Sequence, residues 1–281
     1  MRTSVKVSQA AAAGVLWLIG AVSIGLLVVI VVYVLWQGLP HVTPGFLFRM
    51  PEDMGRAGGI LPTLTTTLYV TALALLVAAP LGVGAALYLA EYTRENIITR
   101  VLRFGTETLA GVPSIIFGLF GTAFFVYGLR LRLSILSGSL TLALMLLPIL
   151  VRTTEEAIKT VPGSYREGSL ALGATKWQTV TRVVLPSAWG GILTGVLLGL
   201  GRAAGETAAL WLTLGGSILR IPISPLEQGR TMTLHLYVLA MEGLSVERAF
   251  ATAACLVAAI LAVDTAAFAL LRRFNRRRFG A

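Results

Sequence analysis

Residues 161–186 read VPGSYREGSLALGATKWQTVTRVVLP, a polar stretch punctuated by glycine and proline between two long apolar runs. Ser164 and Glu167 have the Ser-x-x-Glu spacing of a capping box, which predicts that a helix begins there. Gly173 is placed to end that helix, because glycine adopts the left-handed conformation common at helix C-termini. The first half of the stretch is therefore expected to be one short, exposed helix.

The second half of the same stretch repeats the pattern. Thr175 and Gln178 again have the spacing of a capping box and predict a second short helix. Pro186 suits the first turn of the long helix expected after it. The stretch is thus predicted to form two short helices with a bend at Gly173, held at the mouth of a membrane bundle.

Composition places the whole chain in a membrane. Of its 281 residues, 56% are hydrophobic and only 13% are charged, about half the share usual in soluble domains. The single cysteine, Cys255, excludes an internal disulfide and is expected to be packed in an apolar helix. Neither His41 nor His235 has zinc-ligand spacing around it, so no metal site is predicted and both are interpreted as ordinary loop residues.

Six apolar runs are long enough to cross a bilayer, so the fold class is an all-α integral membrane protein with six transmembrane helices. The runs cover approximately residues 13–36, 63–89, 106–127, 133–151, 186–214 and 249–271. The first run is too long for the core of a signal peptide and is interpreted as an uncleaved helix; the family resemblance described below begins after it, which implies that this helix is peripheral. The predicted organisation is an N-terminal tail, first helix and outer loop (1–61), a membrane domain (62–271) and a basic tail (272–281).

The distribution of basic residues orients these helices. With both termini in the cytoplasm, 15 Lys and Arg residues lie inside and 7 outside, with Arg202 within a span. This bias follows the positive-inside rule and explains the net charge of +10 without nucleic acid as a partner. It also puts the stretch 161–186 in the cytoplasm.

The motifs resemble those of a known family. Glu167-Gly168-Ser169, Gly173 and Leu185-Pro186 resemble the EAA loop of ABC-transporter permeases, with Gly168 and Ser169 where two alanines usually stand. Three further segments resemble phosphate-specific (Pst) permeases of the PstA type; they read VPSIIFGLFG (112–121), RTTEE (152–156) and GRAAGET (201–207). The resemblance covers about residues 62–271 and implies the type-1 permease fold.

Arg202 and Glu206 are the most informative residues for chemistry. Both fall inside the fifth predicted span, where a charge costs about 2.5–3.5 kcal/mol on insertion scales. Their i, i+4 spacing places them on one helical face, which they share with Gly191 and Gly195, so another helix is expected to approach that face closely. They either form an internal ion pair that locks the bundle, or line the path of an oxyanion, with Arg202 donating charge-assisted hydrogen bonds and Glu206 holding the arginine. The family resemblance favours the second.

Two other sites have alternative interpretations. Ser164, Glu167, Gly168 and Gly173 either only cap and end a short helix or, as the resemblance implies, build a helix that docks on an ATPase. Pro113 and Ser114 interrupt the third span, as an ordinary proline kink or as a gating break that lines the substrate route.

The sequence lacks the nucleotide-binding pattern Gly-x-x-x-x-Gly-Lys-Ser/Thr and any nucleophile–base arrangement, so no cofactor site and no enzymatic activity are predicted for this chain. The resemblance implies a permease subunit of a bacterial inner-membrane phosphate importer. Its expected partners are a related PstC-type permease, an ATPase dimer that binds ATP and Mg²⁺, an extracytoplasmic phosphate-binding protein, inorganic phosphate and lipid. Alternatives are a permease for molybdate or sulfate, and an embedded enzyme acting on a lipid phosphate.

Overall fold

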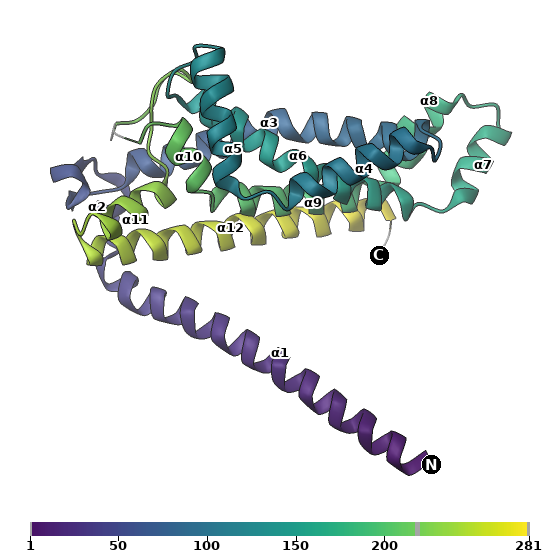
Figure 1. Cartoon of the computed structure of the whole chain (residues 1–281), viewed down its shortest axis with the longest axis horizontal. Helices are drawn as coiled ribbons and strands as arrows, with labels where there is room; N and C mark the ends of the chain where they lie inside the picture. The colour runs from purple at the N-terminus through teal and green to yellow at the C-terminus, as the bar shows by residue number, and fades with distance from the viewer. Residues whose placement is uncertain (1, 217–219, 280–281) are drawn as a thin grey trace.

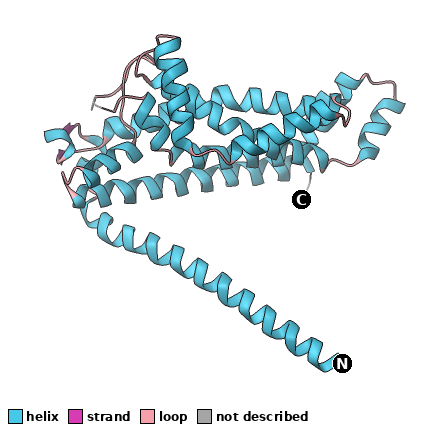
Figure 2. Cartoon of the chain, in the orientation of Figure 1, coloured by secondary structure: helices cyan, strands magenta, loops and turns pink. Residues whose placement is uncertain are grey.

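A computed structural model describes residues 2–216 and 220–279, and Figure 2 shows that most of them are helical. Its elements, in chain order, are α1 (Arg2–Gly38), η1 (Leu39–His41), α2 (Pro44–Phe48), β1 (Pro51–Glu52), η2 (Asp53–Gly55), β2 (Ala57–Gly58), α3 (Leu61–Leu87), η3 (Tyr88–Tyr92), α4 (Ile97–Ala110), α5 (Ser114–Gly121), η4 (Thr122–Gly128), α6 (Ile135–Lys159), α7 (Gly163–Ala171), α8 (Lys176–Thr179), η5 (Val180–Val184), α9 (Leu185–Ala204), α10 (Ala208–Thr213), α11 (Met232–Met241) and α12 (Val246–Phe279). The two short strands pair in a single antiparallel hairpin.

The described residues include five helices that are long and apolar enough to cross a membrane. A sixth span is obtained if α4 and the helical segment 114–128, which meet at an angle of 102°, count as one broken span. This agrees with the predicted all-α membrane fold. Figure 1 places α7 and α8 at one end of the bundle, here called the inner end, and α2, α10 and α11 toward the other, the outer end. Helix α1 begins and helix α12 ends toward the inner end (Figure 1).

Helix α6 is the centre of the bundle and packs against both α3 and α9. Its Leu142, Leu146 and Leu150 are fully buried. Small residues allow the neighbouring backbones to approach: a Cβ added to Gly195 of α9 would lie 2.2 Å from the Thr153 Oγ1 atom of α6. The close helix approach predicted along the glycines of α9 is therefore confirmed, and it is the kind of contact that holds helices together in lipid, where van der Waals packing replaces the hydrophobic effect.

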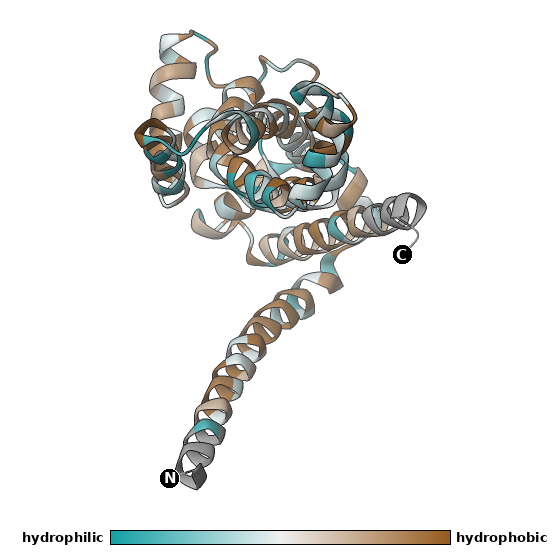
Figure 3. Cartoon of the chain, turned by 90° about the vertical axis from the view of Figure 1, so that its right-hand side faces the viewer, coloured by the Kyte–Doolittle hydropathy of each residue, from teal (hydrophilic) through white to brown (hydrophobic). Residues whose placement is uncertain are grey.

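Helix α1 stands apart from this bundle, as predicted for a peripheral first span (Figures 1 and 3). It contacts the start of α12, where the rings of Tyr33 and Phe250 meet edge to face at 5.7 Å. Most of its large apolar side chains are more than half exposed, including Trp17 at 80%. The rest of the chain does not cover this surface, which suits a helix surrounded by lipid.

Three predicted spans differ from the structure. The span predicted from residue 106 to 127 is instead α4, which begins at Ile97, followed by a sharp turn and then α5 with η4. The span predicted for residues 133–151 continues as α6 to Lys159, because its charged last turns pair with each other and with α4. The span predicted for residues 186–214 ends as α9 at Ala204, and a separate helix, α10, follows.

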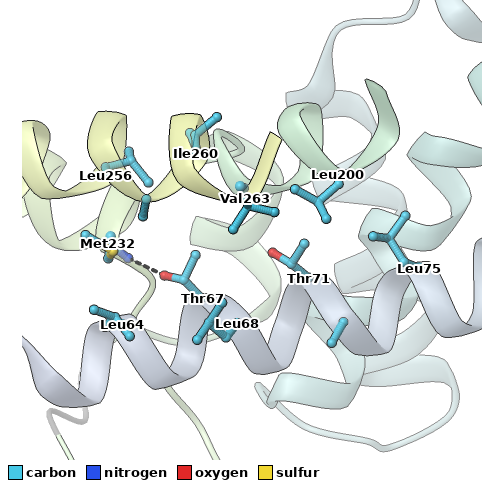
Figure 4. A pocket seen from close by; sticks show the side chains of 13 residues that line it. Leu64, Thr67, Leu68, Thr71, Leu75, Leu200, Met232, Leu256, Ile260 and Val263 are labelled. Atoms are coloured by element: carbon cyan, nitrogen blue, oxygen red, sulfur yellow. Dashed lines mark hydrogen bonds between the residues drawn. The ribbon is translucent and has the colours of Figure 1, made fainter. Parts of the chain in front are cut away.

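The long outer loop predicted for residues 215–247 contains a further helix, α11, which lies inside the outer end of the bundle. Its Leu234, His235 and Leu239 are nearly or fully buried. The backbone nitrogen of Met232 donates to the Thr67 hydroxyl of α3 at 2.9 Å, beside an apolar cavity between α3, α9 and α12 (Figure 4). An apolar helix of ten residues is too short to span a bilayer, so α11 enters the bundle from the outer end without crossing it.

Candidate coupling loop and translocation site

The loop at the inner end has the two helices and the bend that the sequence predicts. Helix α7 ends before Gly173, whose φ of +83° is the left-handed conformation expected there. The capping box at the start of α8 is also confirmed. The Gln178 amide nitrogen donates to the Thr175 hydroxyl at 3.3 Å, and the Thr175 amide nitrogen donates to the Gln178 side chain at 2.9 Å.

The first predicted capping box is wrong. Pro162, not Ser164, is the N-cap of α7, and Ser164 is the second residue of the helix. Among the described residues, neither Ser164 nor Glu167 makes a side-chain hydrogen bond, and both are exposed. Proline fixes φ for the helix entry and needs no partner for a missing N–H, so the chain begins α7 without a side-chain cap. The interpretation of Glu167 as only a cap is therefore excluded.

The second short helix is not separate from the next span. Helix α8 runs through the π-helical segment η5 into α9, so that residues 176–204 form one continuous helical span. Pro186 lies in the first turn of α9, as predicted. A π-bulge of this kind accommodates an extra residue without ending a helix. The bend at Gly173 is thus the one interruption between α7 and the membrane helix that follows it.

An ion pair fixes α7 to the end of α3. The Arg166 guanidinium donates to Glu91 Oε1 from Nη2 at 2.7 Å and from Nε at 3.0 Å. It also donates to the carbonyl oxygens of Val161 at 2.7 Å and Ile158 at 3.0 Å. The Glu91 side chain is 9% exposed and that of Arg166 is 24% exposed. This set of four bonds, here called the Arg166 clamp, joins the loop to η3 and to the last turn of α6.

Two further contacts support the clamp. The Lys176 ammonium lies 5.0 Å from the centre of the Tyr92 ring, a cation–π contact between α8 and η3. The hydroxyls of Ser169 and Thr179 are 2.9 Å apart and join α7 to the end of α8. Both short helices are therefore held to the end of α3.

The inner end contains a second charged network. Glu155, on α6, is buried and lies 2.8 Å from both Arg103 Nε and Lys159 Nζ. Arg103 belongs to α4 and also pairs with Glu95. The sequence motif RTTEE thus supplies, through Glu155, the carboxylate that fixes α4 on α6.

Apolar side chains of the loop face outward. Tyr165, Trp177 and Leu172 are exposed by 53%, 66% and 91%. Large apolar groups grouped on an exposed loop are typical of a surface that binds another protein. The Arg166 clamp thus holds a loop whose exposed residues include three large apolar side chains.

The region of Arg202 and Glu206 is a break between two helices. Helix α9 ends at Ala204, and Glu206 lies in the turn before α10. The Glu206 carboxylate accepts a hydrogen bond from the Ala209 amide at 3.2 Å, and its carbonyl accepts one from the Thr233 hydroxyl at 2.8 Å. Glu206 therefore fixes the first turn of α10 and its contact with α11.

The predicted geometry of this pair is wrong. Because the helix ends between them, Arg202 and Glu206 do not share a helical face, and no ion pair joins them within the described part of the chain. The Arg202 side chain is exposed in the isolated chain. An internal ion pair that locks the bundle is thus excluded. Within residues 2–216 and 220–279, the Arg202 guanidinium meets no carboxylate, so it remains available to another partner.

Pro113 and Ser114 mark the other break. Pro113 is the N-cap of α5, Ser114 is its first residue, and the chain turns by 102° between α4 and the segment 114–128. This turn is much sharper than a proline kink. Helix α5 then packs on α10: a Cβ on Gly118 would lie 2.9 Å from Ala209 Cα, and the Thr122 hydroxyl donates to the Leu212 carbonyl at 2.8 Å.

The two breaks therefore meet in space, because α5 follows one and α10 follows the other. The sequence marks each break with glycine or proline but gives no signal that they pack together.

The sequence also did not predict that Arg230 and His235 are buried; they are 6% and 1% exposed at the outer end. Burial and the neighbouring Arg230 lower the pKa of His235 to about 4. The interpretation of His235 as an ordinary loop residue is wrong, and the short apolar helix that contains it was the available signal.

A multi-pass bundle with an exposed helical loop clamped at its inner end, and with two broken helices packed together toward its outer end, defines the class of type-1 ABC-transporter permeases. The chain belongs to the family described as binding-protein-dependent transport system inner membrane component, which it matches over residues 78–280. It is thus a transport subunit and not an enzyme. Membership makes it part of an assembly with other proteins in the inner membrane.

Several curated proteins resemble the chain closely. It is 33% identical to the probable ABC transporter permease protein YqgI of Bacillus subtilis over 85% of each chain. It is 37% identical to the phosphate transport system permease protein PstA of Xylella fastidiosa, over 64% of this chain and 63% of that one. The PstA of Mycobacterium leprae is 42% identical over 60% of this chain and 54% of its own length. The resemblance to PstA-type permeases predicted from the motifs is confirmed.

Solved structures show the same fold. A methionine ABC transporter, MetNI, in an inward-facing conformation superposes with a TM-score of 0.65 at 20% identity, covering 76% of this chain and 95% of that chain. A bacterial ABC transporter that imports alginate superposes with a TM-score of 0.58 at 17% identity, covering 79% of this chain and 80% of that chain. At these identities the match concerns the fold alone.

Proposed function

We propose that this chain is the PstA-type permease subunit of an importer that moves inorganic phosphate across the bacterial inner membrane. The observation that carries the proposal is Arg202 at the end of α9, within a domain whose PstA relatives are named for phosphate transport. A guanidinium presents a planar set of N–H donors that matches the oxygens of phosphate and keeps its charge at any physiological pH. Arg202 contacts the anion, and Glu206 holds the break open by fixing α10.

The loop at the inner end has the second role in this proposal. Glu167, Gly168 and the outward-facing apolar side chains dock on an ATPase dimer in the cytoplasm, and Gly173 and the Arg166 clamp pass its movement to α3 and α9. ATP and Mg²⁺ are bound by that dimer. A PstC-type permease lies beside this chain, and an extracytoplasmic phosphate-binding protein delivers the substrate at the outer end. Both termini are cytoplasmic, in keeping with the excess of basic residues on that side.

The turn of α4 into α5 at Pro113 and Ser114 contributes the gate. Helix α5 is packed directly on α10, so a rotation at this turn moves the segment that follows Glu206. Broken helices mark substrate routes in other transporters because their free backbone groups and ends line a cavity. The packing of the two breaks supports a gate that moves beside Arg202.

Phosphate uptake by the reconstituted transporter tests the substrate assignment. Arg202 is exposed and meets no carboxylate among the residues that the structure describes, so Arg202→Met is expected to assemble at wild-type abundance and lose uptake at least about tenfold. Arg202→Lys is expected to remain impaired because the ammonium lacks the planar fork. Glu206→Gln, which keeps an oxygen for the Ala209 amide, serves as the matched variant that preserves α10.

Competition by other oxyanions gives the selectivity. Unlabelled phosphate is expected to suppress the uptake of labelled phosphate, with sulfate and molybdate in excess having little effect. Normal uptake by Arg202→Met at wild-type abundance contradicts the role of Arg202. Preferential uptake of sulfate or molybdate contradicts the phosphate assignment while leaving the permease function intact.

A further inference from the structure

A polar cavity of about 260 Å³ lies at the outer end, between the loop that follows α10 and the helix α11. Its lining includes the glycines Gly215 and Gly216 and the charged residues Arg230 and Glu242. A volume several times that of a water molecule in the liquid accommodates a hydrated inorganic anion. The cavity is separate from the apolar cavity of Figure 4, which Leu64, Leu256 and other aliphatic side chains line.

Arg230 is buried without a carboxylate. The residue is 6% exposed, its Nε donates to the Gly216 carbonyl, and its Nη1 lies 3.5 Å from His235 Nδ1. In the part of the chain that the structure describes, no acidic oxygen lies within ion-pair distance of it and Nη2 donates no hydrogen bond. Burial lowers the pKa of Arg230, and the more distant Glu242 raises it. Arginine nevertheless stays charged in proteins, so a nearly buried positive charge lines the cavity.

A buried charge of this kind is costly unless a counter-ion or a set of hydrogen bonds compensates it. One bond to a carbonyl and one long contact to a neutral imidazole leave part of the guanidinium unsatisfied. A tetrahedral oxyanion supplies both the opposite charge and oxygens at the spacing of adjacent N–H groups. We propose that Arg230 and this cavity form a second oxyanion-binding site, which takes inorganic phosphate at the outer end before the anion reaches Arg202.

The fold connects the two sites. Helix α10 has Glu206 before its first residue and Gly215 and Gly216 after its last turn, and six helical residues rise only about 9 Å. Helix α11 contacts both ends: Thr233 donates to the Glu206 carbonyl at 2.8 Å, and the adjacent Leu234 lines the cavity. Glu206, which follows α9 and its Arg202, and the cavity thus lie at opposite ends of one short element. This inference rests on the proposed function for the identity of the anion, but not for the existence of the site.

Glu242 provides a means of testing the site without disturbing the buried arginine. It is an exposed residue that lines the cavity, and its negative charge opposes an anion bound to Arg230. Glu242→Gln therefore strengthens anion binding if the cavity is an oxyanion site. If the cavity binds no anion and Glu242 only offsets the charge of Arg230, the same change does not strengthen phosphate binding.

The experiment is equilibrium binding of radiolabelled inorganic phosphate to the complete transporter in lipid nanodiscs, without the binding protein and without ATP. All variants carry Arg202→Met, which removes the first site. We expect phosphate binding to persist, Glu242→Gln to lower its dissociation constant about threefold or more, and Arg230→Gln, which keeps a donor for the Gly216 carbonyl, to remove one site per transporter.

Loss of all phosphate binding in the Arg202→Met background overturns the proposal. An unchanged or weaker phosphate affinity in Glu242→Gln overturns it as well. Because Glu242 is exposed, this variant is expected to assemble even if Arg230→Gln does not. Labelled sulfate is measured in parallel. If sulfate binds in place of phosphate with the same response to Glu242→Gln, the oxyanion site stands and the phosphate assignment fails, so the two failures are distinguished.

Discussion

Arg166 at the inner end and Arg230 at the outer end both place a guanidinium largely inside the protein, yet among the described residues only Arg166 of the two meets a carboxylate. Arg166 is fully used: it makes two bonds to Glu91 and two to backbone carbonyls. Arg230 makes one bond to a carbonyl and a long contact to His235. The same residue type thus has two roles, since a satisfied arginine joins helices and an unsatisfied one is open to a ligand.

The largest expected effect comes from removing the satisfied arginine. Arg166→Met leaves Glu91 buried and unpaired, which is expected to lower the free energy of unfolding by about 2–4 kcal/mol. It is also expected to abolish the stimulation of ATP hydrolysis by the binding protein, because α7 loses its attachment to α3. Thermal unfolding in detergent and ATPase assays of the reconstituted complex measure the two effects.

A matched control separates a buried from an exposed pair at the same end. Arg152 is 58% exposed and pairs with Glu107 and Glu156. Arg152→Met is expected to cost no more than about 1 kcal/mol, because surface ion pairs contribute little. Equal destabilisation by the two substitutions would contradict the distinction between the clamp and a surface pair.

The next effect concerns the bend of the loop that the clamp holds. Gly173 has a φ of +83°, which costs a residue with a side chain about 1–2 kcal/mol, more for a β-branched one. Gly173→Val is expected to disorder the bend and reduce stimulated ATP hydrolysis several-fold while the chain still inserts. Gly163, which has open space around its α-carbon and no positive φ, is the control. Gly163→Ala is expected to keep full stimulation, and unchanged stimulation in Gly173→Val contradicts the coupling role of the bend.

The sequence predicts best where local signals decide the structure. Hydropathy located the apolar stretches but not the sharp turn between α4 and α5. Gly173 and the Thr175–Gln178 box predicted the bend and the start of α8 correctly, because each depends on residues close in the chain. The box at Ser164 failed since Pro162 begins the helix without a side-chain bond. Both interpretations of Ser164 used the same spacing, which alone cannot tell a cap from a second helical residue.

The candidate site was predicted in its residues but not in its geometry. Arg202 and Glu206 were identified correctly as unusual in an apolar span, but Gly205 does not by itself reveal that the helix ends there. The break is stabilised by Thr233, 27 residues further along the chain. Glu91, Arg230 and His235 were missed for the same reason: their roles depend on partners brought together by the fold, and hydropathy does not report such contacts.

A smaller effect tests the outer end through pH. His235 is buried beside Arg230, and its pKa is lowered to about 4 from a usual value of 6.5. The folded protein therefore holds this imidazole neutral while the unfolded chain binds a proton, so the associated stability is complete above pH 6.5 and is lost as the pH falls toward 4. We expect a loss of about 1 kcal/mol between pH 6.5 and 5.5.

Thermal unfolding at several pH values measures this dependence. His235→Gln removes the titrating group and is expected to flatten the slope between pH 6.5 and 5.5. His41→Gln, at an exposed position of the same end, controls for the background titration of the protein. An unchanged slope of stability against pH in His235→Gln contradicts the assignment of a buried, neutral imidazole. It also contradicts the description of Arg230 as a cation whose contacting neighbour His235 is uncharged.

The smallest expected effect compares the two predicted capping boxes within the loop. The Thr175 hydroxyl accepts the Gln178 amide, so Thr175→Ala removes a real cap and is expected to cost about 1 kcal/mol locally. Ser164 makes no such bond, so Ser164→Ala is expected to change local stability by less than about 0.5 kcal/mol. Hydrogen exchange at the Gln178 amide is the direct measurement: it should accelerate about fivefold in Thr175→Ala, since 1 kcal/mol corresponds to that ratio, and stay unchanged in Ser164→Ala. Faster exchange of the amides in the first turn of α7 in Ser164→Ala would show that Ser164 caps α7 after all and would restore the Ser164–Glu167 box. If instead hydrogen exchange is faster only in Thr175→Ala, Ser164 and Glu167 do not stabilise α7. Their exposed side chains are then available to the partner that docks on the loop.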